Sequence, residues 1–221
     1  MFKQVVKTVK KMIDPYGGDK ESYVFDDPLA STIDWKPLNK GGTSMQTHKL
    51  VMVNADRMEF KPASGAVLFG VLLVLVGIGI VSGVVYYEYM KNALRMASPI
   101  VIASGIGLIF AVFGAKFIYS IKVPIVFDRM YGHYWKGWVD SVQGVDFNLL
   151  KVHVPLREIH ALQVIAEFCK GQKSSYLSYE LNIVKRDGSR LNVVDHGCLK
   201  AVRDDAKQLA EFLRVPLWEG L

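Results

Sequence analysis

The chain has 221 residues, of which 51% are hydrophobic, and a formal net charge of +6. The basic excess is spread thinly and forms no stripe, which argues against a nucleic-acid-binding protein. No glycine-rich phosphate loop, nucleophile elbow or zinc-binding helix motif is present in the sequence, so the commonest enzyme signatures are missing.

Residues 1–14 have the pattern of a short basic amphipathic helix, because apolar side chains recur at helical spacing and lysines occupy the other positions. Two interpretations remain open: the helix lies on anionic lipid, or it packs on the protein's own domain. Its apolar residues are Phe2, Val5, Val6, Val9, Met12 and Ile13, and its lysines are Lys3, Lys7, Lys10 and Lys11.

Residues 15–61 are rich in turn-forming residues and predict a loop-rich cytoplasmic segment. Within it, residues 45–60 alternate apolar and polar side chains on both sides of a turn near residues 54–56, which indicates one or two short strands. Whether these strands join the C-terminal domain stays open.

Two uncharged apolar stretches follow, at residues 62–87 and 96–115. A hydrocarbon core of about 30 Å is crossed by roughly 20 helical residues, so we expect a transmembrane hairpin over residues 62–121. The predicted spans cover about residues 64–87 and 97–118. The first cannot be a cleaved signal peptide, because a long and mostly polar segment precedes it. The alternative is a pair of buried helices in a soluble domain.

Basic residues set the expected orientation. The linker between the spans carries Lys91 and Arg95, whereas more basic residues flank the outer ends of the hairpin, so both termini are expected in the cytoplasm. Cys169 and Cys198 then lie where thiols stay reduced, and no disulfide is expected. The basic residues expected to face anionic lipid headgroups are Lys3, Lys7, Lys10, Lys11, Lys61, Lys116, Lys122 and Arg129.

Small residues recur every fourth position in the second span, at Ala103, Gly107, Ala111 and Ala115, and Gly79 with Gly83 forms a matching pair in the first. This pattern predicts close helix packing, either within one chain or between two copies. Apart from Lys116 at the boundary, the spans carry no acid or base, which argues against a transporter or a proton path. A pore would need polar lining, and only Ser82, Ser98 and Ser104 are available.

The cytoplasmic residues 122–221 have β character. Strands are expected over residues 124–131, 134–139, 149–154, 159–168, 176–185 and 190–194, with Asp187-Gly188 forming a tight turn. Residues 198–214 form a helix with one apolar stripe that closes the domain; the stripe comprises Leu199, Val202, Ala206, Leu209, Ala210 and Leu213. Residues 125–221 are expected to fold as one soluble unit.

Four stretches in this order resemble bacterial two-span membrane proteins with a cytoplasmic pleckstrin-homology-like (PH-like) domain. They are Val126-Phe127-Asp128-Arg129, Pro155 to Gln163, Tyr179 to Val184, and Val215-Pro216-Leu217-Trp218. The resemblance implies an α+β membrane protein, with a transmembrane hairpin and an antiparallel β domain closed by a C-terminal amphipathic helix. It also implies a scaffold or sensor, with no catalytic set and no cofactor.

The expected function is therefore that of a non-enzymatic inner-membrane interaction protein. It would dock a protein partner or lipid headgroups, form a homo-oligomer, or serve as a subunit of a membrane assembly. The competing class is a membrane-associated enzyme or metal-dependent protein that uses His196 and Cys198, from the only dense cluster, Asp195-His196-Gly197-Cys198. Asp195 serves equally well as a turn or capping residue.

Overall fold

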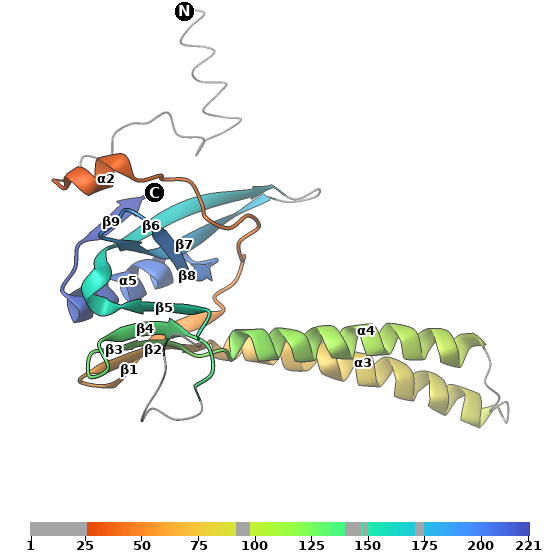
Figure 1. The fold of residues 1–221 in the computed structure, drawn as a ribbon. Coiled ribbons are helices and arrows are strands. Elements are labelled where there is room, and N and C mark those ends of the chain that lie inside the picture. Colours follow the sequence, from red (N-terminus) through yellow and green to blue (C-terminus); the bar gives the residue numbers. More distant parts are fainter. Residues whose placement is uncertain (1–25, 92–97, 140–146, 148–149, 171–174) are drawn as a thin grey trace, which may run out of the picture.

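The computed structural model describes residues 26–91, 98–139, 147, 150–170 and 175–221. Two β-sheets form a domain at one end, and a pair of long helices projects from it (Figure 1). The predicted amphipathic helix, with Lys3, Lys7, Lys10 and Lys11, lies outside the described residues. Both of its interpretations therefore stay predictions.

The first sheet is an antiparallel meander of five strands in chain order. Its strands are β1 (His48–Asn54), β2 (Arg57–Pro62), β3 (Ile125–Asp128), β4 (His133–Lys136) and β5 (Val152–Pro155). Strand β2 pairs with β3, with Phe60 opposite Ile125. The segment before the first span therefore supplies two strands of the domain. The expectation that residues 125–221 fold as one soluble unit stays untested, and the pairing of β2 with β3 argues against it because that fragment lacks β1 and β2.

The helical hairpin is an insertion between β2 and β3. Helix α3 (Ser64–Met90) begins directly after β2, and α4 (Ser98–Ile121) ends just before β3. Both helices are long and apolar enough to cross a membrane. Many of their large apolar side chains are exposed, and Ile109, for example, is 69% exposed. The alternative of two helices buried in a soluble domain is therefore wrong.

The second sheet has four strands in the order β8-β7-β6-β9. They are β6 (Ile159–Lys170), β7 (Ser175–Lys185), β8 (Arg190–His196) and β9 (Leu217–Gly220). The β7–β8 turn contains Gly188 at φ +80°, a left-handed conformation that glycine adopts without strain. Strand β9 pairs parallel to β6, so the domain is not wholly antiparallel. The sequence pattern did not predict β9.

The hydrophobic core lies between the two sheets and α5 (Leu199–Leu213). A short 3-10 turn, η2 (Leu156–Glu158), carries the chain from the first sheet to the second. Helix α5 buries Val202, Ala206 and Leu209 in this core, and its polar residues other than Asp205 lie toward its outer face. The largest buried side chains from the sheets include Met58, Phe60, Phe127, Tyr134, Leu162 and Leu181.

The outer face of the second sheet is also covered. Helix α2 (Pro28–Thr32) packs Ala30 against Trp218 and its neighbours, and residues 34–46, which we call the strap, continue across β6 and β7 (Figure 1). Asp27 caps α2 by accepting a hydrogen bond from the Leu29 amide. The central part of the β6–β7 pair is therefore buried on both faces.

Candidate functional site

Basic and aromatic side chains gather where the helices meet the domain. Lys61 precedes α3, Lys122 follows α4, and both are exposed. Lys116 is also exposed and lies five residues before the end of α4, which corresponds to about 8 Å along the helix. The rings of Tyr119 and Trp138 have centroids 6.4 Å apart. Lysines together with Trp and Tyr are typical of a membrane–water interface.

Arg129 departs from its predicted place at the membrane surface. Strand β3 leads away from α4, so Arg129 lies beyond the opposite end of that strand. Its guanidinium lies 4.1 Å from the centre of the Phe212 ring and donates to the Phe212 carbonyl oxygen at the end of α5. Arg129 is only eight residues from the end of α4, which suggested a place at the membrane surface. The intervening strand advances about 3.3 Å per residue and so carries Arg129 away from that surface.

Small residues bring α3 and α4 into close contact, but the contacting glycines of α3 are not the expected pair of Gly79 and Gly83. Gly107 lies against Gly77, and Gly114 lies against Gly70. Ala103 is buried, whereas Ala111 is only half-buried, although its backbone and Cβ lie beside Gly77. Gly79 and Gly83 have open space beside them and do not meet α4 within this chain, and Ala115 is exposed.

The physical reason is helical drift. Steps of four residues turn about 400°, so each step moves the stripe by about 40° around the helix. By Ala115 the stripe has left the contact face, and Gly114 takes its place. The contacting glycines lie seven residues apart on each helix, the spacing of a coiled-coil seam. A packing role for Gly79, Gly83 and Ala115 between copies of the chain stays a prediction.

The Asp195-His196-Gly197-Cys198 cluster does not converge on one site. His196 is fully buried, whereas Cys198 is exposed and caps α5 through its backbone position. Asp195 accepts a hydrogen bond from Asn192 at 2.9 Å on the other face of the strand. Within the described residues, no three His, Cys, Asp or Glu side chains are placed to share a metal ion.

His196 belongs instead to a buried cluster near the base of the hairpin. Its Nε2 lies 3.6 Å from Asp205 Oδ2, and neither ring nitrogen has a hydrogen-bond partner among the described residues. Burial lowers the pKa of His196 to about 4 and raises the pKa of Asp205 to about 6. Burial, with the nearby charge of Lys136, also lowers the pKa of His48 to about 4.

His48 links this cluster to the end of α4. Its Nε2 lies 3.0 Å from the Ile121 carbonyl oxygen, and its Nδ1 lies 2.9 Å from Thr47 Oγ1. Because a carbonyl oxygen can only accept, Nε2 carries the proton in this arrangement. The cluster therefore joins β1 to the last residue of α4 through a polar contact, next to the buried pair of His196 and Asp205.

Two carboxylates hold the strap on the second sheet. Glu180, which is fully buried, accepts hydrogen bonds from the Leu38 and Asn39 amides, both at 2.9 Å. Glu167 accepts in the same way from Gly41 at 2.8 Å and Gly42 at 2.9 Å. Sequence reasoning missed this role, because polar residues at alternate strand positions usually face water. The only signal in the sequence was the large number of polar residues on one face of β6, β7 and β8, where Gln163, Asn182 and Asn192 lie with the two glutamates.

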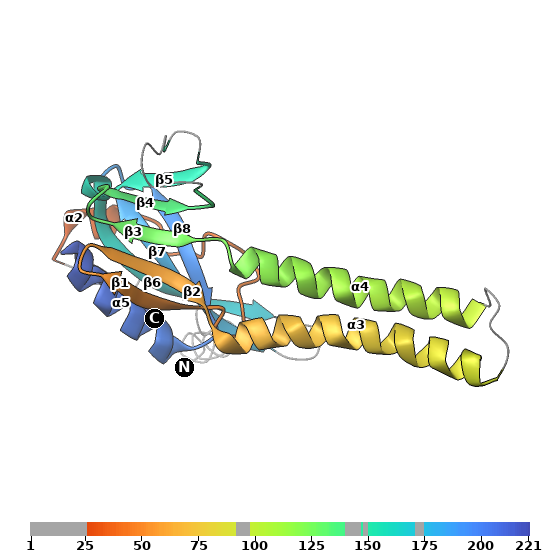
Figure 2. The same ribbon diagram turned by 90° about the horizontal axis from the view of Figure 1, so that it is seen from below.

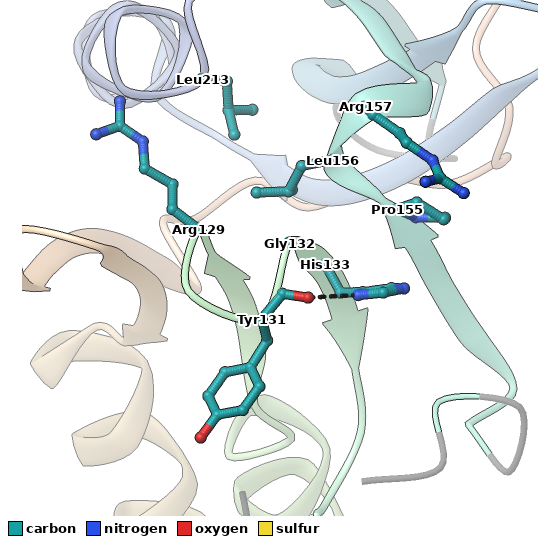
Figure 3. Close-up of a pocket in the computed structure, with 8 residues that line it drawn as sticks. All are labelled: Arg129, Tyr131, Gly132, His133, Pro155, Leu156, Arg157 and Leu213. Atoms are coloured by element: carbon teal, nitrogen blue, oxygen red, sulfur yellow. Dashed lines mark hydrogen bonds between the residues drawn. The ribbon is translucent and has the colours of Figure 1, made fainter.

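A groove of about 520 Å³ lies at the end of the domain far from the helices. It is lined by Arg129, Tyr131, Gly132, His133, Pro155, Leu156, Arg157 and Leu213. Figure 3 shows Leu156 and Leu213 between the side chains of Arg129 and Arg157, which point away from each other. The His133 ring stacks on Phe147 with centroids 4.1 Å apart, and its Nδ1 donates to the Tyr131 carbonyl oxygen at 2.7 Å.

The groove is apolar in the middle and cationic on both sides. Within the described residues, neither Arg129 nor Arg157 forms an ion pair with a carboxylate. Arg186 donates from Nε to the Arg157 carbonyl oxygen at 2.8 Å and adds an exposed guanidinium beside the groove. Such a surface suits an apolar side chain with acidic neighbours, and it offers no pair of groups arranged for acid–base chemistry.

Comparison with known proteins finds no matching family model, no matching curated protein and no matching solved structure. Function is therefore inferred from the geometry of this chain.

Proposed function

We propose that this chain is a bacterial-type inner-membrane protein with two spans and both termini in the cytoplasm, and that its PH-like domain docks a protein partner. The observation that carries the proposal is the insertion of the apolar α3–α4 hairpin between β2 and β3. A domain joined to the membrane through two neighbouring strands has one end at the membrane and the other end directed away from it.

Membrane insertion is supported by the exposed apolar surface of the hairpin. Soluble monomers rarely leave a continuous apolar patch of more than a few hundred Å² in water, and both helices expose apolar residues along their length. Lys61, Lys122, Tyr119 and Trp138 at the hairpin base supply the interfacial residue types. The cytoplasmic side is supported by the excess of basic residues there.

The PH-like assignment is supported by two packed sheets with one amphipathic helix, α5, against the core. Two features differ from the simplest form of that architecture. The hairpin interrupts the first sheet between its second and third strands, and β9 follows α5 and pairs parallel to β6. Such a domain serves as an interaction module and needs no cofactor.

The groove favours a protein partner over a lipid headgroup. The four residues of β3 span about 13 Å, so the groove lies at least that far beyond the end of the strand that joins α4. The strands of the first sheet run roughly in line with the helix axes in both views (Figures 1 and 2). A headgroup of the same bilayer does not reach that end. The groove suits a segment of a cytoplasmic protein, or of a subunit in a membrane assembly, that carries an apolar side chain with acidic neighbours. The apolar side chain packs on Leu156, and the acidic neighbours lie near Arg129 and Arg157.

Photo-crosslinking in cells tests this proposal. A photoreactive phenylalanine analogue replaces Tyr131 in the groove and, as the control, Lys207 on the exposed face of α5. We expect a discrete protein adduct from position 131 only, and its loss when Arg157→Glu reverses the charge beside the groove. The matched charge reversal Lys200→Glu should leave the adduct intact. Equal adducts at both positions, or an adduct that survives Arg157→Glu, contradict docking in the groove.

The competing enzyme class has a separate test. It requires Cys198 to act with His196 as a nucleophile or metal ligand, but Cys198 is exposed whereas His196 is fully buried. Cys198→Ala should therefore leave the cellular phenotype of the protein unchanged. A loss of phenotype with normal protein levels would favour the enzyme.

A further inference from the structure

Strands β6 and β7 extend beyond the rest of their sheet. The last paired residue of β8, His196, lies opposite Tyr179, and the last paired residue of β9, Gly220, lies opposite Ile165. Past these points, residues 166–170 of β6 pair only with β7. We call residues 166–170 and 175–178 the ribbon. Five strand residues span about 17 Å, so the ribbon is a substantial projection.

The ribbon projects on the same side of the domain as the helical hairpin. In both views its end extends past the level at which α4 ends, and Figure 1 shows it set apart from the two helices to one side (Figures 1 and 2). With α3 and α4 across a bilayer, the ribbon therefore lies at the level of the headgroups.

The ribbon presents interfacial side chains. Phe168 is 40% exposed, Tyr176 is 36% exposed, and Lys170 is exposed between them in sequence. An isolated two-stranded ribbon is marginally stable in water, but this one is braced by the strap. The Tyr176 hydroxyl donates to the Gly42 carbonyl oxygen at 2.8 Å, and Glu167 accepts from the Gly41 and Gly42 amides. The pairing places Phe168 and Lys170 on one face of the ribbon and Tyr176 on the other, so the strap holds one face and leaves Phe168 and Lys170 exposed on the opposite one.

We propose that the ribbon rests on the membrane surface beside the hairpin and forms an additional lipid contact of the domain. The ring of Phe168 lies in the interface, and Lys170 on the same face of the ribbon faces anionic headgroups. This inference rests on the proposed membrane insertion of α3 and α4. Aromatic rings favour that zone, and a lysine near an anionic leaflet contributes about 1 kcal/mol.

The contact has a consequence for the whole domain. The hairpin alone lets the domain tilt about its base, whereas an additional lateral support restricts the tilt. The groove at the opposite end is then held toward the cytoplasm, where a soluble partner reaches it.

Fluorescent labelling in vesicles tests the contact. The full chain, with Cys169 and Cys198 replaced by Ser, is reconstituted in vesicles of phosphatidylcholine with phosphatidylglycerol. An environment-sensitive dye is placed at Phe168→Cys on the ribbon, Met130→Cys at the far end of the domain, or Val76→Cys in the middle of α3. Met130 is a suitable control because it is 75% exposed. Lipids with a nitroxide near the headgroup quench dyes at the interface.

We expect strong quenching at position 168 and none at position 130, with lipid contact at position 76 detected by a nitroxide deep in the acyl chain. If position 168 resembles position 130 while position 76 contacts lipid, the ribbon faces water or a protein partner, and the inference is overturned while the proposed insertion stands. If position 76 also remains unquenched, the hairpin is not inserted and both proposals fail.

A second variant separates lipid contact from mere proximity. With the dye at Lys170→Cys, the additional change Phe168→Asp places a charge in the interface and should reduce quenching several-fold. The matched change Met130→Asp should have no effect. Undiminished quenching with Phe168→Asp would overturn the role of the aromatic ring.

Discussion

Gly77 and Gly107 lie against each other across the hairpin, so that a Cβ atom on Gly107 would lie 2.6 Å from the Gly77 carbonyl oxygen. The pair Gly70 and Gly114 repeats this contact two turns away, with a Cβ on Gly114 lying 2.7 Å from the Gly70 carbonyl oxygen. Since real Cβ atoms do not approach so closely, these four positions set the distance between the two helices. A larger side chain at any of them must push the helices apart.

The first prediction concerns this contact. Gly107→Leu should lower the thermal stability of the detergent-solubilised protein, because overpacking costs about 1–3 kcal/mol. Gly105→Leu is the matched control, since Gly105 has open space beside it. Melting temperatures of the two variants, measured in the same detergent, should differ clearly. Equal losses would show that Gly107 makes no close contact with α3.

The second prediction follows from the insertion of the hairpin between paired strands. Phe60 and Ile125 are directly opposite each other, so in the same register residue 62 lies opposite residue 123, and a two-residue Asn-Gly turn can replace residues 63–122. The shortened chain should fold as a soluble β domain with a cooperative thermal transition. The fragment of residues 125–221 should not fold, because it leaves the β3 edge and the core without β1 and β2. A folded fragment of residues 125–221 would contradict the five-stranded sheet.

The third prediction is a pH dependence of that soluble domain. His48 and His196 have pKa values lowered from 6.5 to about 4, so the stability they contribute is present above pH 6.5 and lost as the pH falls to about 4. Asp205 has its pKa raised from 3.8 to about 6, so its contribution is present below pH 3.8 and lost as the pH rises to about 6. The two histidines together change the free energy of unfolding with pH more than the one carboxyl group does.

Between about pH 4 and 6 the unfolded chain therefore binds about one more proton than the folded chain at these sites, and stability should rise by about 1.4 kcal/mol per pH unit. Asp205→Asn removes the opposing contribution and should steepen the slope, whereas His196→Asn should flatten it. Urea unfolding at a series of pH values measures both. Slopes that change in the same direction for both variants would contradict the buried cluster.

The fourth prediction concerns the strap. Glu180→Gln retains the shape of the side chain but replaces an acceptor by an amide group that cannot accept from both strap amides. A hydrogen bond to a charged group contributes about 1.5–3 kcal/mol, so a loss of that order is expected. Hydrogen exchange of the Leu38 and Asn39 amides should accelerate, while that of the β6–β7 pairing should not. Glu211→Gln on the exposed face of α5 is the control. If both variants change stability and hydrogen exchange equally, Glu180 does not hold the strap in place.

Local patterns predicted much of this structure. The long apolar runs indicated α3 and α4, and alternation indicated β6, β7 and β8 to within a few residues, because each pattern reflects burial of one continuous segment. The pairing of β2 with β3 was beyond such reasoning, since it joins residues more than sixty positions apart in the chain. Strand β9 was too short and too close to a proline for its pattern to be distinct.

The candidate site was less accessible to sequence reasoning. Arg129 and Arg157 come from different elements and become neighbours of one groove only through the packing of η2 and α5. Glu167 and Glu180 look like solvent-facing strand residues, and their partners are backbone amides, which carry no signal in the side-chain sequence. The every-fourth-residue pattern in α4 identified the contact face near Gly107 but could not identify Gly77 as its partner.

The most direct test of the account is the accessibility of the two ends of the molecule in intact cells. In a Cys198→Ser background, Lys91→Cys lies at the end of α3 and Lys207→Cys on the exposed face of α5. A membrane-impermeant maleimide should label position 91 in intact cells and position 207 only after the inner membrane is permeabilised. Labelling of position 207 in intact cells with position 91 protected would reverse the orientation, and release of the protein from membranes by alkaline washing would contradict the transmembrane hairpin itself.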